Sequence, residues 1–271
     1  MAEYSTILKK FNSLQNKTLG RLINNGLAVT ASKKIIDLII IDLEKKNKNL
    51  KILDFGSGNL RWSKFFKNFI NFETSDIENS DGTFFNEKYD IILKNDKISR
   101  QDNTYDVIIS IKVLEHVENP NKVFEELSRV LKKDGVLYVS VPGLFPLHFE
   151  PHNYYNFTPY SLKKLGEKNN LEIISIKEEG GGFYLIGILL MRIPFYIINS
   201  NNFKKSKFKL MIFLSLFILS PFFNFVFPVL CRLLDKIFKT QGVTSSYFVK
   251  YKKKWLLKTV FNRDVKNFFK I

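Results

Sequence analysis

Cysteine is almost absent from this chain, which has 271 residues and a single thiol at Cys231. One cysteine excludes an internal disulfide framework and is typical of a protein in a reducing compartment. The first residues, MAEYSTILKKFNSLQNK, have neither an apolar core nor a small-residue cleavage site. We therefore predict no secretory signal and expect an intracellular protein.

Acidic residues are scarce in the last quarter of the sequence. Residues 201–271 contain 15 Lys and Arg but only two acids, Asp235 and Asp264, and so carry +13 of the net charge of +16. A basic excess spread over the whole chain would indicate a nucleic-acid partner. A local excess beside apolar runs favours anionic lipid headgroups instead. We therefore expect an anionic membrane surface as a partner and do not expect nucleic acid.

Apolar runs alternate with helix-like segments between residues 50 and 180. KILDF, NFETSDI, YDIIL, YDVIISI, VLYVSVP and LEIISIKEE are typical of strands. NLRWSKFFKNF is predicted to turn helical after the glycines, and NPNKVFEELSRVLKKDG is predicted to be an amphipathic helix that stops at Gly135. TPYSLKKLGEKNN also has helical spacing and opens with Thr158 as cap and Pro159 at its first position. The alternation predicts an α/β fold with a doubly wound, mostly parallel sheet. Ligands of such sheets bind beyond the carboxyl ends of the strands.

A glycine-containing turn follows the first predicted strand, where KILDFGSGNLRW places Asp54, Gly56 and Gly58. Glycines allow a tight turn and leave room for a ligand, and nearby N–H groups can face its polar atoms. Strand-to-helix turns also carry glycines for steric reasons alone, so both interpretations stay open here. Asp76 comes 22 residues after Asp54, at the end of the next strand, where a carboxylate can accept hydrogen bonds from ribose hydroxyls. A solvated loop acid is the alternative.

The order of these motifs, followed by NTYDVIISIKVLEHV and ELSRVLKKDGVLYVSVP, resembles the class I S-adenosylmethionine-dependent methyltransferases of the small-molecule, type 11-like branch. The resemblance covers about residues 50–180. It implies a Rossmann-like fold, S-adenosylmethionine as cofactor and methyl transfer as activity. NAD would use the same fold, but it does not predict the LEHV segment.

The resemblance also implies roles for individual residues. Asp54, Gly56 and Gly58 would line the methionine part of the cofactor, and Asp76 would hold the ribose. The acid that often meets adenine aligns with Lys94, so Asp96 or backbone groups would take this role. Leu60 stands where a third glycine is usual.

The segment LHFEPHNYYNFT follows the fifth predicted strand. It resembles a subset of these enzymes with an H-x-x-P-H-[DN]-Y-[YW]-R-[FY]-T segment, which is associated with surface-polysaccharide or glycolipid synthesis. Asn156 replaces the usual arginine. We expect this loop to form the wall over the transferred methyl, with Tyr154 and Tyr155 stacking on a sugar or shaping the substrate pocket.

Methyl transfer to a hydroxyl needs an aligned acceptor and usually a general base. Histidine suits this role near neutral pH. The candidates are His148 and His152 in the loop, and Glu115 and His116 at the end of the fourth strand, which we expect to face the same cleft. One of the two loop histidines is expected to be structural, and LEHV could serve mainly the cofactor pocket. No ligand set with convincing spacing appears, so no metal is predicted.

Two apolar runs, FYLIGILLMRIPFYII and LMIFLSLFILSPFFNFVFPVLC, precede the last strand-like segment. The second has 22 uncharged residues, long enough to span a bilayer. A single span would separate the last strand from its sheet, and a spanning hairpin would translocate a lysine-rich loop against the positive-inside tendency. We favour runs that lie in or dip into the membrane interface. A dimer interface or a buried lid is the remaining alternative.

Together these observations predict a methyltransferase at the cytoplasmic face of the cell membrane. Its acceptor would be a small molecule or a lipid-linked compound, and we favour O-methylation of a lipid-linked glycan or lipid intermediate. RNA methylation and a catalytically degenerate membrane-anchored scaffold are the alternatives, and the oligomeric state is open. The predicted segments are an N-terminal helical segment (1–48), the methyltransferase domain (49–182 and 240–254), an apolar membrane-associated insert (183–239) and a basic amphipathic tail (255–271).

Overall fold

The computed structural model describes residues 33–45, 49–66, 68–78, 87–199, 226–238 and 242–254, with the single residues 207, 211, 215, 222 and 240. Contacts divide the chain into two compact units, residues 36–179 with 244–271, and residues 1–35 with 180–243. The predicted basic tail, most of the predicted N-terminal helical segment and most of the apolar run at residues 210–231 lie outside the described residues.

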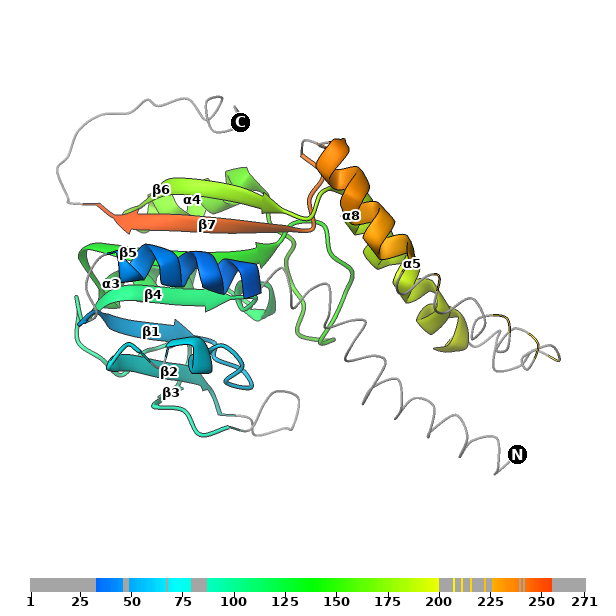
Figure 1. Ribbon diagram of the computed structural model, residues 1–271. Helices are drawn as coiled ribbons and strands as arrows, with labels where there is room; N and C mark the ends of the chain where they lie inside the picture. The colour runs from blue at the N-terminus through cyan, green and yellow to red at the C-terminus, as the bar shows by residue number, and fades with distance from the viewer. Residues whose placement is uncertain are drawn as a thin grey trace. The chain divides into compact units, whose positions relative to one another are not determined.

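A seven-stranded sheet forms the centre of the first of these units (Figure 1). Its strand order is β3-β2-β1-β4-β5-β7-β6, and β7 is antiparallel to both neighbours. The order reverses between β1 and β4, which places the switch point there. The predicted doubly wound, mostly parallel α/β fold is thereby confirmed. The strands are β1 (Lys51–Phe55), β2 (Asn71–Ile77), β3 (Ile91–Leu93), β4 (Tyr105–Ile111), β5 (Leu131–Pro142), β6 (Leu171–Glu179) and β7 (Ser246–Lys253).

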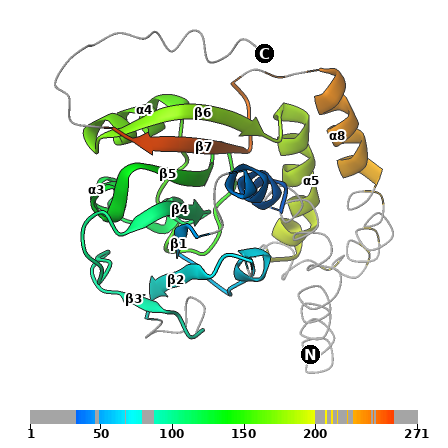
Figure 2. The ribbon, with the colours of Figure 1, turned by 60° about the vertical axis from the view of Figure 1, so that its left-hand side comes forward.

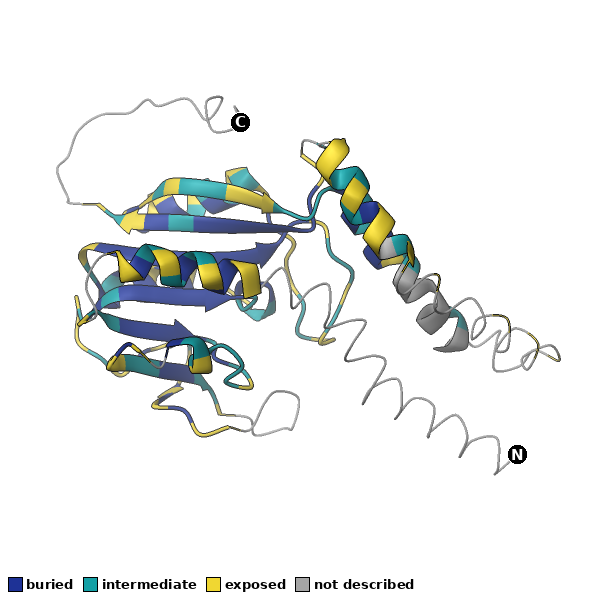
Figure 3. Cartoon of the chain, in the orientation of Figure 1, coloured by how far each residue is buried: buried dark blue, intermediate teal, exposed yellow. Residues whose placement is uncertain are grey.

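Helices cover both faces of the sheet (Figures 1 and 2). Helices α3 (Pro120–Val130) and α4 (Pro159–Lys168) share one buried apolar cluster with the central strands. A helix over residues 33–44 lies on the opposite face. Its Asp42 carboxylate accepts a hydrogen bond from the Tyr138 hydroxyl and forms an ion pair of 2.7 Å with Lys250. The central strands β1, β4, β5 and β7 are mostly buried, whereas β2 and β6 are largely half-buried or exposed (Figure 3).

The helix ends show where local sequence decided the structure. Helix α4 opens with the predicted Thr158 cap, whose hydroxyl accepts from the Ser161 N–H, and with Pro159 at its first position. Helix α3 ends at Val130, earlier than the predicted stop at Gly135, because Leu131 already pairs with Tyr105 of β4. Among the described residues of NLRWSKFFKNF, the regular structure is the 3-10 turn η2 (Ser63–Phe66), which follows a left-handed Leu60 with φ of 53°.

In the second unit, helices α5 (Gly182–Asn199) and α8 (Phe227–Ile237) pack against each other. Asp235 of α8 caps the start of α5, because its carboxylate accepts from the N–H groups of Gly181, Phe183 and Tyr184 at 2.8–3.1 Å. None of the helices, as far as the structure describes them, is long and apolar enough to cross a membrane.

Candidate active site

The turn after β1 is fastened to β2 by its own backbone. The N–H groups of Gly56 and Ser57 both donate to the Ser75 carbonyl at 2.9 Å. Gly56 and Gly58 have φ of 74° and 53°, a region that side chains rarely adopt. A Cβ on Gly56 would lie 2.4 Å from Val113 Cγ2. The glycine at position 56 is therefore required both by the turn and by close packing against the segment after β4.

Asp76 joins this turn to the end of β2. Its carboxylate accepts from the Gly58 N–H at 2.7 Å and from its neighbour Ile77 N–H at 2.8 Å. The side chain is half-buried, and burial raises its pKa while the two backbone hydrogen bonds lower it. The two hydrogen bonds hold the carboxylate at the carboxyl end of β2. This is the position at which the sequence predicts a ribose-binding acid.

Asp54 is buried at the end of β1, with 3% of its surface exposed. Its Oδ2 has no hydrogen-bond partner among the described residues. Burial, reinforced by the charge of Asp76, raises the pKa of Asp54 to about 7 despite the Ser57 hydrogen bond. A buried, unsatisfied carboxylate oxygen fits a cationic partner such as the ammonium group of S-adenosylmethionine. The residues at this end of the sheet therefore suit the predicted cofactor.

The loop after β3 carries the candidates for the adenine contact. Lys94 is exposed, whereas Asp96 is half-buried with φ of 61°. Burial raises the pKa of Asp96, with Lys122 lowering it and Glu118 raising it. Asp96 is therefore a carboxylate that is partly shielded from water, and it lies just beyond the carboxyl end of β3. Its contact with adenine stays a prediction.

Glu115 and His116 belong to the short 3-10 helix η3 (Leu114–His116) that follows β4. Glu115 is fully buried, and burial raises its pKa to about 7 although Lys112 lowers it. Neither of its carboxylate oxygens has a hydrogen-bond partner among the described residues. Burial lowers the pKa of His116, so its imidazole is neutral at pH 7.

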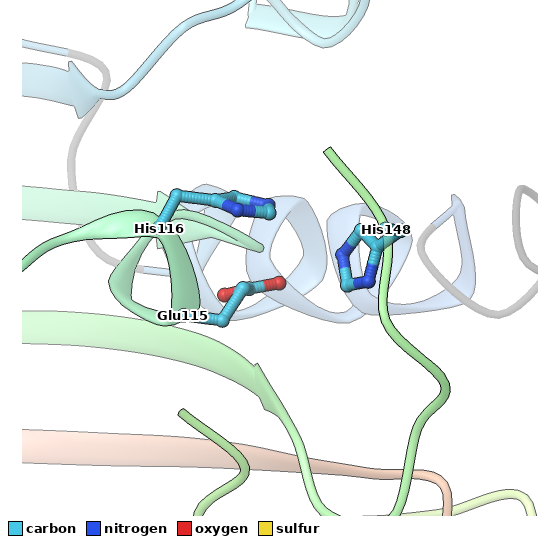
Figure 4. Close-up of side chains that lie close together, drawn as sticks. All are labelled: Glu115, His116 and His148. Carbon is cyan, nitrogen blue, oxygen red and sulfur yellow. The ribbon is translucent and has the colours of Figure 1, made fainter. Parts of the chain in front are cut away.

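The loop after β5, residues 143–158, is tied onto this turn. The Tyr154 N–H donates to the Glu115 carbonyl at 2.8 Å, and the Phe157 N–H returns the chain to the Pro142 carbonyl at 2.9 Å. Within the loop the His148 N–H donates to Asn153 Oδ1 at 3.3 Å. These hydrogen bonds place the His148 side chain beside Glu115 and His116 (Figure 4). The ring centres of His148 and His116 are 4.9 Å apart.

His152 contributes to the cluster through its backbone and not through its ring. Its carbonyl accepts from His116 Nδ1 at 2.6 Å. Its own ring faces the Tyr154 hydroxyl at 3.2 Å, and Tyr155 donates to the Glu118 carbonyl at 2.8 Å. Both tyrosines are about two-fifths exposed, at 40% and 39%. Of the predicted residues, Glu115, His116 and His148 thus converge, while His152, Tyr154 and Tyr155 lie together beside them.

Lys112 and Tyr89 are functional candidates that sequence reasoning missed. Lys112 Nζ donates to Ser246 Oγ of β7 at 2.6 Å, and burial lowers its pKa although Glu115 raises it. The sequence carried a signal for Lys112, because a lysine directly after a buried strand lies at the carboxyl end of the sheet, where ligands bind. Tyr89 donates to the Gly58 carbonyl at 2.7 Å, and only the fold brings these two residues together.

Comparison with known proteins identifies the family of the chain. The family model described as "Methyltransferase domain" matches residues 30–176, more than half of the chain, so the chain belongs to this family. No relative among curated proteins matches it. The protein is a class I S-adenosylmethionine-dependent methyltransferase.

Three solved structures illustrate the likeness. A candidate sarcosine dimethylglycine methyltransferase from Galdieria sulphuraria is 16% identical, with 82% of this chain and 86% of that chain covered and a TM-score of 0.49. A candidate methyltransferase from Bacillus halodurans is 15% identical, with coverage of 80% and 98% and a TM-score of 0.49. Phospholethanolamine N-methyltransferase 2 from Haemonchus contortus, in complex with phosphomonomethylethanolamine and S-adenosylhomocysteine, is 13% identical, with coverage of 76% and 49% and a TM-score of 0.42.

Proposed function

We propose that this methyltransferase methylates a hydroxyl of a lipid-linked glycan or lipid intermediate at the cytoplasmic membrane surface. The observation that carries the location is an apolar face on α8. Val229, Leu230, Leu233 and Ile237 recur at helical spacing and are 46–69% exposed. Arg232 and Lys236 lie on the same helix. Exposed apolar side chains with adjacent cations suit an anionic lipid surface.

The cofactor is assigned to the turn after β1 and the end of β2. Asp54 would hold the methionine ammonium, Gly56 and Gly58 would leave the backbone open to the ligand, and Asp76 would accept from the ribose hydroxyls. Asp96 would approach the adenine. When bound, S-adenosylmethionine supplies a methyl group on a sulfonium and leaves as S-adenosylhomocysteine.

The chain's own residues must align the acceptor and remove its proton. Loss of a hydroxyl proton is assigned to the cluster of Glu115, His116 and His148, because their nitrogen and oxygen atoms converge within 4.8 Å. The oxygen then forms its bond to the methyl carbon, and the electron pair of the broken carbon–sulfur bond stays on sulfur. Tyr154 and Tyr155 would pack against the acceptor sugar at the exposed side.

Methyl-labelled S-adenosylmethionine tests the acceptor class. The protein is incubated with membranes of the source organism, and label is followed into the organic-solvent extract, the water-soluble fraction and RNA. We expect label in the lipid extract, stable to mild alkali as an ether is, and none from an Asp76→Asn variant. Label in RNA or only in water-soluble compounds would replace this proposal, and binding of S-adenosylmethionine without any transfer would favour a scaffold.

A further inference from the structure

We propose that Glu115, His116 and His148 bind one divalent first-row transition metal ion, which activates the acceptor hydroxyl. The inference builds on the proposed function but rests on side-chain geometry of its own. Each of the three residues offers one ligand atom, and these atoms lie within 4.8 Å of one another. Figure 4 shows the three side chains pointing toward one another from η3 and from the loop after β5.

The buried carboxylate is the first argument. Glu115 is 0% exposed, and neither of its oxygens has a hydrogen-bond partner among the described residues. A buried carboxylate without a hydrogen-bond partner is unfavourable, and a directly coordinated metal ion is one of the partners that would compensate it. The nearby Lys112 directs its ammonium group to Ser246 Oγ at 2.6 Å instead. A cation between Glu115 and the histidines would satisfy the carboxylate.

The hydrogen bonds of the two imidazoles are the second argument. His116 Nδ1 contacts the His152 carbonyl at 2.6 Å, and His148 Nδ1 contacts the Pro146 carbonyl at 3.0 Å. A carbonyl oxygen only accepts, so each Nδ1 carries the proton and each Nε2 carries a lone pair. Metal-binding histidines typically have this arrangement, in which a carbonyl orients the ring and makes it a stronger ligand.

The donor set indicates which ions would bind. Two imidazoles and one carboxylate suit Zn²⁺ or another first-row transition ion, whereas Mg²⁺ and Ca²⁺ prefer oxygen ligands alone. Ligand atoms around a tetrahedral Zn²⁺ lie about 3.4 Å apart, so binding would draw the side chains together by up to about 1.4 Å. Three protein ligands leave a coordination position open.

The open position explains what the ion would do. With the ion bound, Glu115, His116 and His148 act as its ligands, and the ion replaces their role as general base. An acceptor hydroxyl bound at the open position has a lowered pKa and loses its proton to water more readily. The resulting oxygen attacks the methyl carbon, while the carbon–sulfur electron pair stays on sulfur. The ion is neither oxidised nor reduced, so no further reactant is needed.

The test measures Zn²⁺ and Co²⁺ binding to the full chain after chelator treatment. We expect one ion per chain by equilibrium dialysis and, with Co²⁺, the visible absorption bands of a low-coordinate site. Glu115→Gln, His116→Gln and His148→Gln should each weaken binding at least about tenfold. The chain has only three histidines, and His152→Gln is the matched control that should retain the metal.

S-adenosylmethionine binding is measured on the same samples, which also shows that each variant is folded. A wild-type chain that binds the cofactor but no metal would overturn the metal site and leave the proposed function standing. Metal binding that persists at full strength in His148→Gln would overturn it as well. Metal binding without cofactor binding would support the site and count against the proposed function.

Discussion

Gly56 shows how one residue can serve both the backbone and the packing of the cofactor turn. Its φ is 74°, and a Cβ at this position would lie only 2.4 Å from Val113 Cγ2, so no space is left for a side chain. Gly242 has a similar φ of 76° but nothing within 4 Å of a Cβ. Comparing alanine substitutions at Gly56 and Gly242 therefore distinguishes the cost of backbone strain, which both share, from the cost of steric contact, which is present at Gly56 alone of the two.

Gly56→Ala is expected to lower the free energy of unfolding by about 2–4 kcal/mol, against about 1 kcal/mol for Gly242→Ala. Adding Val113→Ala should recover part of the loss at position 56, because it removes the contact but not the strain. Denaturant unfolding measures all three variants. Equal effects at the two glycines would show that the contact with Val113 is unimportant.

The raised pKa of Asp54 leads us to predict that cofactor binding releases a proton. Burial raises its pKa to about 7, so part of the population is protonated at neutral pH. An ammonium neighbour favours the ionised form, and affinity should therefore fall as the pH is lowered below 7. Calorimetry in buffers of different ionisation enthalpy should detect the proton at pH 6.5.

The release should disappear in Asp54→Asn and persist in Glu115→Gln, whose carboxyl also has a pKa of about 7 in the wild type. An unchanged release in Asp54→Asn would exclude Asp54 as its source.

At the scale of elements, regular strands and caps were predictable because their causes are local. TPYSLKKLGEKNN carries its own cap and first-turn proline, and the structure confirms both. The helix predicted after Gly58 failed because Leu60 takes a left-handed conformation that propensity does not reveal. The sequence predicted that His148, Glu115 and His116 face one cleft, but it did not predict that their nitrogen and oxygen atoms converge within 4.8 Å. That convergence depends on loop hydrogen bonds such as Tyr154 N–H to the Glu115 carbonyl, which have no local sequence signal.

The contact of Asp235 with α5 is a second non-local feature, and it gives a prediction for the α5–α8 pair. Asp235→Ala removes a carboxylate that accepts from three N–H groups at the start of α5. We expect a loss of about 1–2 kcal/mol in the local stability of that helix end. Hydrogen exchange at the Phe183 and Tyr184 amides should accelerate accordingly. Lys236→Ala, one residue away, is the control, and equal exchange in both variants would refute the capping role.

At the scale of the whole molecule, the basic excess and the apolar face of α8 predict membrane binding. The full chain should float with vesicles that contain anionic lipid, and less so at high salt. Leu233→Glu with Ile237→Glu should reduce flotation, whereas Ile70→Glu should not, although Ile70 is 84% exposed. A chain that forms concentration-dependent dimers and never floats would assign the face to a second copy instead.

Composition favours a membrane surface, which stays a prediction, and it says nothing of the acceptor, because an acceptor is recognised by a few side chains of a loop. The motifs predicted the cofactor end of the sheet more fully, since Asp54, Gly56, Gly58 and Asp76 follow strands whose order is set by the fold. Tyr154 and Tyr155 lie on the loop, and their role depends on a ligand that the sequence does not encode.

The most direct test of this account is calorimetric titration of S-adenosylmethionine into the wild-type chain and into Asp76→Ala, with the exposed Glu167→Ala on α4 as control. The account predicts that the wild type and the control bind alike and that Asp76→Ala loses at least about tenfold in affinity, because the ribose then loses a charged acceptor. A folded wild-type chain that does not bind, or an Asp76→Ala variant that binds equally well, would contradict the assignment of this edge of the sheet as the cofactor site.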